Sequence, residues 1–309
     1  MFESFSIVLF LEAAIRLAVP LAVVALGESI TERSGVLNIG IEGSIIAGAL
    51  CGALAAMEWS SILLGMVFGA IGGGLVAMVF AIFVLGLNSD QIITGTATTL
   101  AGLGFTGVIY QARFGTTGSV ITLPVLKSLE VPFLRDIPIL GPIFFQQSIT
   151  VYFVYFLVPA LWYFLFKTSW GLELRSVGED PAVAEEAGIR VLFVRFLAIL
   201  FGGLSAGLAG AHLALDSGTF IENMSGGRGF IAIAVVVLGR WNPVPIVGAA
   251  MFFGAASALQ FLLQSSGSNL PFPFFLMLPY VLTLIALSGW FGRTKAPGSL
   301  ALPWPPKSG

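Results

Sequence analysis

Long apolar runs are the feature of this sequence that most constrains its fold. Seven runs of roughly 20 residues are each long enough to cross the ~30 Å hydrocarbon core of a bilayer as a helix. They lie near residues 7–26, 62–87, 91–111, 149–167, 192–215, 244–264 and 270–291. Two shorter apolar segments, near 40–57 and 229–239, also fit helices. Charged residues make up only 10% of the chain, whereas a soluble domain carries roughly 25%, because its water-facing surface needs them. The sequence therefore predicts an all-α polytopic membrane protein of about nine transmembrane helices.

Basic residues indicate the orientation of these spans. They concentrate in the segment 167–195 and in the C-terminal tail, and loops rich in Lys and Arg stay on the cytoplasmic side. Counting back from them places the loop 27–38 inside, and the N-terminus and the long loop 112–148 outside. The first apolar run has no clear cleavage site, so it is interpreted as a retained span rather than a signal peptide.

The order of the segments repeats with opposite orientation. Repeat one covers about 7–111 and repeat two about 192–291, and the helix 149–167 links them within one transmembrane domain, 1–309. Each repeat has a span, a glycine-containing motif, a short helix, a break, a long helix and a final span. Inverted repeats are typical of transporters, whose path follows the repeat interface.

Polar residues interrupt the apolar pattern at 27–43, GESITERSGVLNIGIEG. Glycines here permit backbone shapes that survive at membrane depth only where protein or water satisfies them. Glu42 is notable because an ionisable residue near the membrane is costly and usually functional. Together, Glu42 and Asn38 predict a structured element at the inner mouth of a translocation path. The alternative is an ordinary cytoplasmic loop.

A second polar stretch, 86–99, begins a span. Asn88, Asp90, Gln91 and Thr94 are candidates for the same path, although Asp90 is also a good helix N-cap and the threonines can bond to their own helix. Gln260, in a later span, faces either a pore or a neighbouring helix.

The segment 175–190, RSVGEDPAVAEEAGIR, predicts a short capped helix between two spans. Asp180 suits the N-cap, Pro181 the first helical position and Gly188 the terminating position. Because such short helices are unstable alone in water, this one is expected to pack against something. It either enters a groove of a cytoplasmic partner or lies on the membrane surface as a connector.

The stretches 25–43, 176–215 and 226–243 resemble, in order and spacing, the permeases of bacterial ABC importers in the simple-sugar and nucleoside branch of the ribose and branched-chain amino acid permease superfamily. Within that branch the chain is most similar to the shorter of the paired nucleoside permeases. The resemblance implies a permease domain of the type II importer fold. It also implies that the segment 175–190 docks on the ATPase. The residues expected to contact it are Gly178, Glu179, Asp180, Pro181, Ala182, Val183, Ala184, Ala187 and Gly188.

The resemblance further implies that this chain is a transport subunit without enzymatic activity, in the inner (plasma) membrane. Its implied partners are a cytoplasmic ABC ATPase that binds ATP and Mg, an extracytoplasmic substrate-binding protein, and a second permease, as a heterodimer or a homodimer. No lysine follows a glycine, so the chain has no GxxxxGK phosphate loop of its own. We expect no cofactor, metal site or nucleic-acid partner. Nucleosides are the expected substrates. The alternatives are simple sugars, an ion-coupled secondary transporter and a passive channel.

Overall fold

Helices make up nearly all of the regular structure in the computed structural model, which describes residues 7–115, 122–265, 277, 281 and 295–305. The first half contains α1 (Ile7–Arg33), α2 (Ile41–Trp59), α3 (Ile62–Ala81), a π-helical turn η1 (Ile82–Gly86) and α4 (Gln91–Phe114). The second half contains α5 (Ile149–Lys167), α6 (Ser169–Glu179), α7 (Pro181–Glu186), α8 (Val191–Ser217), α9 (Arg228–Leu238) and α10 (Pro243–Ser265). Eight of the nine expected apolar segments are therefore helices, and the expected span 270–291 lies outside the described residues apart from residues 277 and 281.

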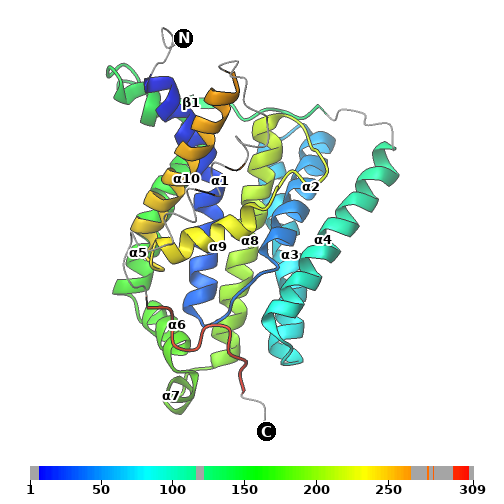
Figure 1. The fold of residues 1–309 in the computed structure, drawn as a ribbon, viewed down its shortest axis with the longest axis vertical. Helices are drawn as coiled ribbons and strands as arrows, with labels where there is room; N and C mark the ends of the chain where they lie inside the picture. Colours follow the sequence, from blue (N-terminus) through cyan, green and yellow to red (C-terminus); the bar gives the residue numbers. More distant parts are fainter. Residues whose placement is uncertain (1–6, 116–121, 266–276, 278–280, 282–294, 306–309) are drawn as a thin grey trace.

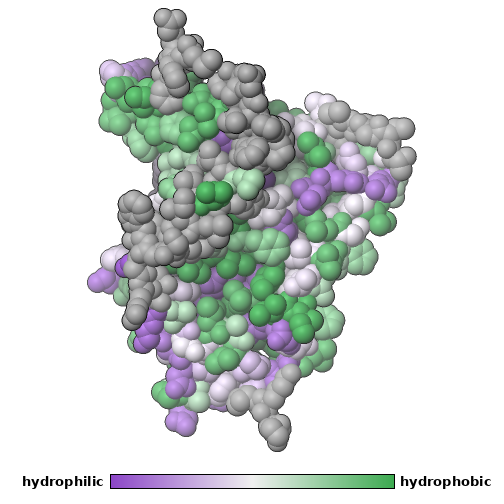
Figure 2. Space-filling view, in the orientation of Figure 1, coloured by the Kyte–Doolittle hydropathy of each residue, from purple (hydrophilic) through white to green (hydrophobic). Residues whose placement is uncertain are grey.

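Seven helices within the described residues are long and apolar enough to cross a membrane. They are α1, α2, α3 with η1, α4, α5, α8 and α10, while α9 is apolar but shorter. Hydrophobic residues cover much of the visible face between the two ends, and hydrophilic residues gather at the lower end around α6 and α7 (Figure 2). The expected polytopic membrane architecture is confirmed.

Close packing of α2, α3 and α8 forms the centre of the bundle. A Cβ atom on Gly73 of α3 would lie 2.5 Å from the backbone of Gly207 on α8, so these two helices approach with no room for side chains. Without a hydrophobic driving force in lipid, small residues of this kind allow helices to gain van der Waals contact.

Segments predicted for opposite sides of the membrane gather at opposite ends of the molecule (Figure 1). At one end, α6 and α7 lie beside the segment 295–305. At the other end, Arg113 at the end of α4 pairs with Glu58 at the end of α2, 3.2 Å apart. The loop between α4 and α5 lies at this second end and includes two short antiparallel strands, β1 (Ser128–Glu130) and β2 (Gln146–Ser148).

The strands and a second π-helical turn, η2 (Gly141–Phe145), were not expected from the sequence. In the same loop the carboxylate of Glu130 accepts a hydrogen bond from Arg135, which raises the pKa of that guanidinium above its ordinary value. The pairing is exposed to solvent, so it contributes little to stability.

Candidate functional site

The segment between α5 and α8 forms a helical hairpin at the lower end of the bundle (Figure 1). Asp180 caps α7 as expected, because its Oδ1 accepts hydrogen bonds from the amides of Ala182 and Val183 at 3.0 and 3.2 Å. Gly188 ends the turn in the left-handed region, with φ of 86°. The sequence interpretation missed α6, although the hydroxyl of Thr168 caps it and was the available signal.

The expected coupling residues divide between two faces of this hairpin. Ala184 is only 2% exposed and belongs to the chain's own hydrophobic core. Gly178 is buried as well, and a Cβ there would collide with the backbone carbonyl of Arg33. The others are exposed or half-buried: Glu179, Asp180, Pro181, Ala182, Val183, Ala187 and Gly188. The outward surface available to a partner is therefore smaller than the sequence suggested.

The segment 27–43 is more helical than expected. Helix α1 continues to Arg33, so only 34–40 is an irregular loop. Gly27 does not break the helix; it allows α1 to approach α8 so closely that a Cβ there would lie 2.5 Å from the Cβ of Ser205. The expectation that the apolar helix ends near 26 is corrected, because packing against α8 holds the polar turns in helical form.

Buried polar groups surround this loop. Glu28 and Glu32 on α1 are fully buried; Glu28 accepts from the amide of Asn38 at 3.0 Å, and Glu32 accepts from the indole N–H of Trp241. The side-chain amide of Asn38 is also buried, without a hydrogen-bond partner among the described residues. The loop 34–40 is thus a structured element rather than a solvent-exposed connection.

Glu42 joins the two halves of the chain. It lies in the first turn of α2, 3% exposed, and its carboxylate accepts from the amides of Gly227 and Gly229 at 2.7 and 2.6 Å. Those amides belong to the start of α9, which crosses the middle of the bundle (Figure 1). The free amides and dipole of a helix start favour an anion, so Glu42 holds the starts of α2 and α9 together.

Asn88 and Gln91 lie at the lower end and bond to neighbouring loops. The Asn88 amide donates to the carbonyl of Pro305 at 2.9 Å. The buried Gln91 accepts from the amide of Leu37 at 2.8 Å. Both side chains thus position α4 against the chain's own loops.

Asp90 and Thr94 line a hollow of about 760 Å³ between α4 and the helices α2 and α3. Asp90 caps α4, accepting from the amides of Ile92 and Ile93 at 2.9 Å each. The hydroxyl of Thr98, on the same wall, donates back to the carbonyl of Thr94 at 2.7 Å. Most of the lining is apolar. Gln260, the remaining candidate, is buried on α10, so the seven candidates are spread over several regions.

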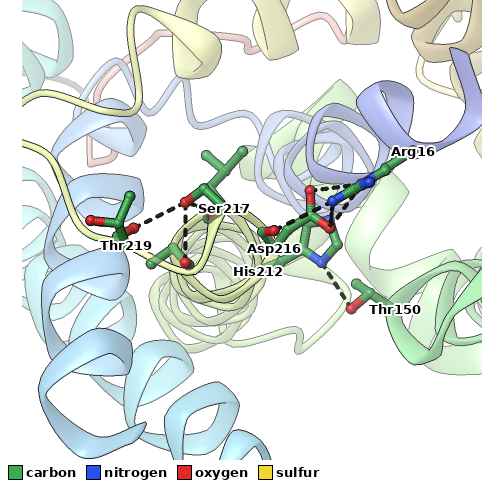
Figure 3. Close-up of polar contacts among 8 residues, drawn as sticks. Arg16, Thr150, His212, Asp216, Ser217 and Thr219 are labelled. Atoms are coloured by element: carbon green, nitrogen blue, oxygen red, sulfur yellow. Dashed lines mark hydrogen bonds and ion pairs between the residues drawn. The ribbon is translucent and has the colours of Figure 1, made fainter. Parts of the chain in front are cut away.

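A polar cluster at the upper end was not recognised in the sequence (Figure 3). Arg16 of α1 donates to the carboxylate of Asp216 of α8 at 2.9 Å, so these two opposite charges on apolar helices are paired. One turn earlier on α8, the buried ring of His212 lies 3.0 Å from the hydroxyl of Thr150 on α5. The residues are far apart in sequence, so no local pattern indicates the pairing. Across the described residues, no group of three His, Cys, Asp or Glu side chains is arranged to hold a metal ion.

The fold and these sites define a multi-pass membrane protein with buried polar residues inside the bundle and a capped helical hairpin at one end. Residues 10–287 match the family model described as branched-chain amino acid transport system / permease component. The chain belongs to this family of permeases, and it is a multi-pass protein of the inner membrane.

Three similar proteins are transporter permeases. The chain is 38% identical to the guanosine ABC transporter permease protein NupQ of Bacillus subtilis over 308 residues, 93% of each protein. It is 38% identical to the putative glucose ABC transporter permease protein TsgC13 of Haloferax volcanii, over 82% of this chain and 78% of that protein. It is 33% identical to the nucleoside ABC transporter permease protein NupC of Lactococcus lactis, over 90% of each. No solved structure matches the chain significantly.

Proposed function

We propose that this chain is the translocation subunit of an ABC importer for nucleosides. The observation that carries the proposal is the identity to a guanosine permease along 93% of both proteins. The similarity to a nucleoside permease covers 90% of both proteins and points to the same substrate class. Simple sugars are the second candidate, because the chain is also 38% identical to a putative glucose permease, although over a shorter alignment of 259 residues.

In this proposal the energy comes from a separate ATPase that binds ATP and Mg. The exposed side of α7, with Ala182, Val183 and Ala187, is the docking surface. Ala184, on the opposite side of α7, packs into the chain's own hydrophobic core and holds the helix in place. ATP binding to the partner moves the hairpin and shifts the permease between outward- and inward-open states, which requires the partner to bind the two states differently. A substrate-binding protein delivers the nucleoside at the opposite end.

The proposed architecture is two inverted repeats with about nine spans, counting 270–291. Its support is a correspondence between the halves: α1 and α8, each of 27 residues, are followed by loops that lead to the starts of α2 and α9. Those two starts meet at Glu42. The hollow beside α4 forms one wall of the path, and a second permease, different or identical, completes it.

Uptake in cells that carry the complete importer tests the function. The cells express this chain with its ATPase, its companion permease and its binding protein, and take up radiolabelled guanosine. We expect uptake that is lost without this chain or with an ATPase that cannot hydrolyse ATP, and that excess adenosine, but not excess glucose, competes. Uptake of radiolabelled glucose without uptake of guanosine supports the sugar importer. Uptake that persists with the inactive ATPase contradicts an ABC importer of either kind.

A further inference from the structure

The segment 297–305, here called the strap, crosses the lower end of the bundle beside α6 (Figure 1). Ser299 attaches it to the coupling hairpin. Its amide and its hydroxyl both donate to the carbonyl of Gly178, at 2.9 and 2.8 Å, and Ser299 is only 4% exposed. The amide of Gly298 adds a contact to the carboxylate of Glu179 at 3.3 Å. The strap is thus attached where α6 leads into α7.

Arg195 fastens the middle of the strap. This side chain, near the start of α8, is 1% exposed and donates to three neutral oxygens. They are the carbonyl of Ser34, the hydroxyl of Ser299 and the carbonyl of Leu302, at 3.1, 3.2 and 3.1 Å. A buried guanidinium is costly unless its donors are satisfied, so the strap supplies two of the acceptors on which Arg195 depends.

The far end of the strap contacts the start of α4. Asn88 donates to the carbonyl of Pro305 at 2.9 Å, and Gln91 donates to the carbonyl of Leu302 at 3.4 Å. Helix α4 otherwise packs mainly against α2, and more lightly against α3. The strap therefore connects α4, which lines the hollow, to the coupling hairpin in the other half of the chain.

We propose that the strap carries movement of the coupling hairpin to α4, with Ser299 and Asn88 as positioning residues at its two ends. This inference rests on the proposed importer function. A docked ATPase pulls on α7, and α6 moves with it because the two helices are joined at the Asp180 cap. The hydrogen bonds of Ser299 pass the movement to the strap. The contact with Asn88 passes it to α4 and so to the wall of the path.

The test is the number of guanosine molecules imported per ATP hydrolysed by the complete importer in proteoliposomes. Ser299→Ala removes the hydroxyl at the hairpin end, and Asn88→Ala removes the amide at the α4 end. A typical hydrogen bond contributes about 1 kcal/mol net, which corresponds to a roughly fivefold change in an equilibrium constant. We expect each variant to lower the import ratio by about fivefold, while ATP hydrolysis and the yield of assembled complex stay near wild type.

Thr96→Ala is the matched control on α4. Among the described residues, the hydroxyl of the exposed Thr96 bonds only to its own helix, at the carbonyl of Ile92. Its import ratio should remain that of the wild type. A wild-type ratio in either strap variant overturns the proposal. If the importer with Ser299→Ala does not assemble, the import ratio of the Asn88→Ala variant alone tests the proposal, because Asn88 is only half-buried. A wild-type complex without substrate-stimulated ATP hydrolysis contradicts the importer function instead, so the two failures are distinguishable.

Discussion

Glu42 is the residue whose role is most clearly defined by its contacts. Its carboxylate satisfies two amides at the start of α9 while it lies in the first turn of α2. Glu42→Ala leaves the buried amide of Gly229 and the half-buried amide of Gly227 without this acceptor. The loss at the buried amide costs roughly 1–3 kcal/mol. We expect a marked fall in the melting temperature of the detergent-solubilised protein and loss of uptake. Glu42→Gln retains one carbonyl oxygen, so its melting temperature and its uptake should lie between those of Glu42→Ala and the wild type.

The control for this prediction lies at the other end of the same helix. Glu58 is exposed, and its ion pair with Arg113 lies at the surface, where such pairs contribute at most about 1 kcal/mol. Glu58→Ala should therefore leave melting temperature and uptake almost unchanged. Equal effects at the two positions would show that the junction of α2 and α9 does not depend on Glu42.

At the scale of the element, α7 presents one face to the chain and another to a partner. Ala184 is 2% exposed, whereas Val183 beside it is 60% exposed. Ala184→Trp overpacks the core, which costs roughly 1–3 kcal/mol, so it should lower the melting temperature of the permease itself. Val183→Trp should leave that temperature unchanged and reduce co-purification of the ATPase.

The two tryptophan variants serve as controls for each other, because they are neighbours on one short helix. Normal ATPase co-purification with Val183→Trp would contradict docking on this face. A stable Ala184→Trp protein would contradict the seating of α7 against α8 and α6.

At the scale of the whole molecule, the orientation in the membrane can be tested by labelling. Cys51 is the single cysteine, so Cys51→Ser provides a background for placing others. We expect Leu129→Cys, in the exposed strand β1, to react with an impermeant maleimide on intact cells. Val183→Cys should react only after permeabilisation. The reverse pattern would contradict the orientation drawn from the basic residues.

The sequence by itself determined which segments are helices and where several of them begin. An apolar run of about 20 residues forms a helix in lipid, because a helix satisfies the hydrogen bonds of its own backbone where no water is present. Caps are equally local: the Asp90 and Asp180 carboxylates reach amides only two and three residues away. These interactions depend on neighbours in the chain, so they could be predicted without knowing the fold.

The tertiary structure alone decided what the polar residues contact. Glu42 meets Gly227, Arg16 meets Asp216, and Arg195 meets the strap. Each contact joins segments more than 100 residues apart in the chain. The burial of Ala184 is of the same kind, because it depends on which side of α7 packs against the bundle. Long-range pairing depends on how the helices pack, and the many helices of similar apolar composition in this chain allow several arrangements that only the folded structure distinguishes.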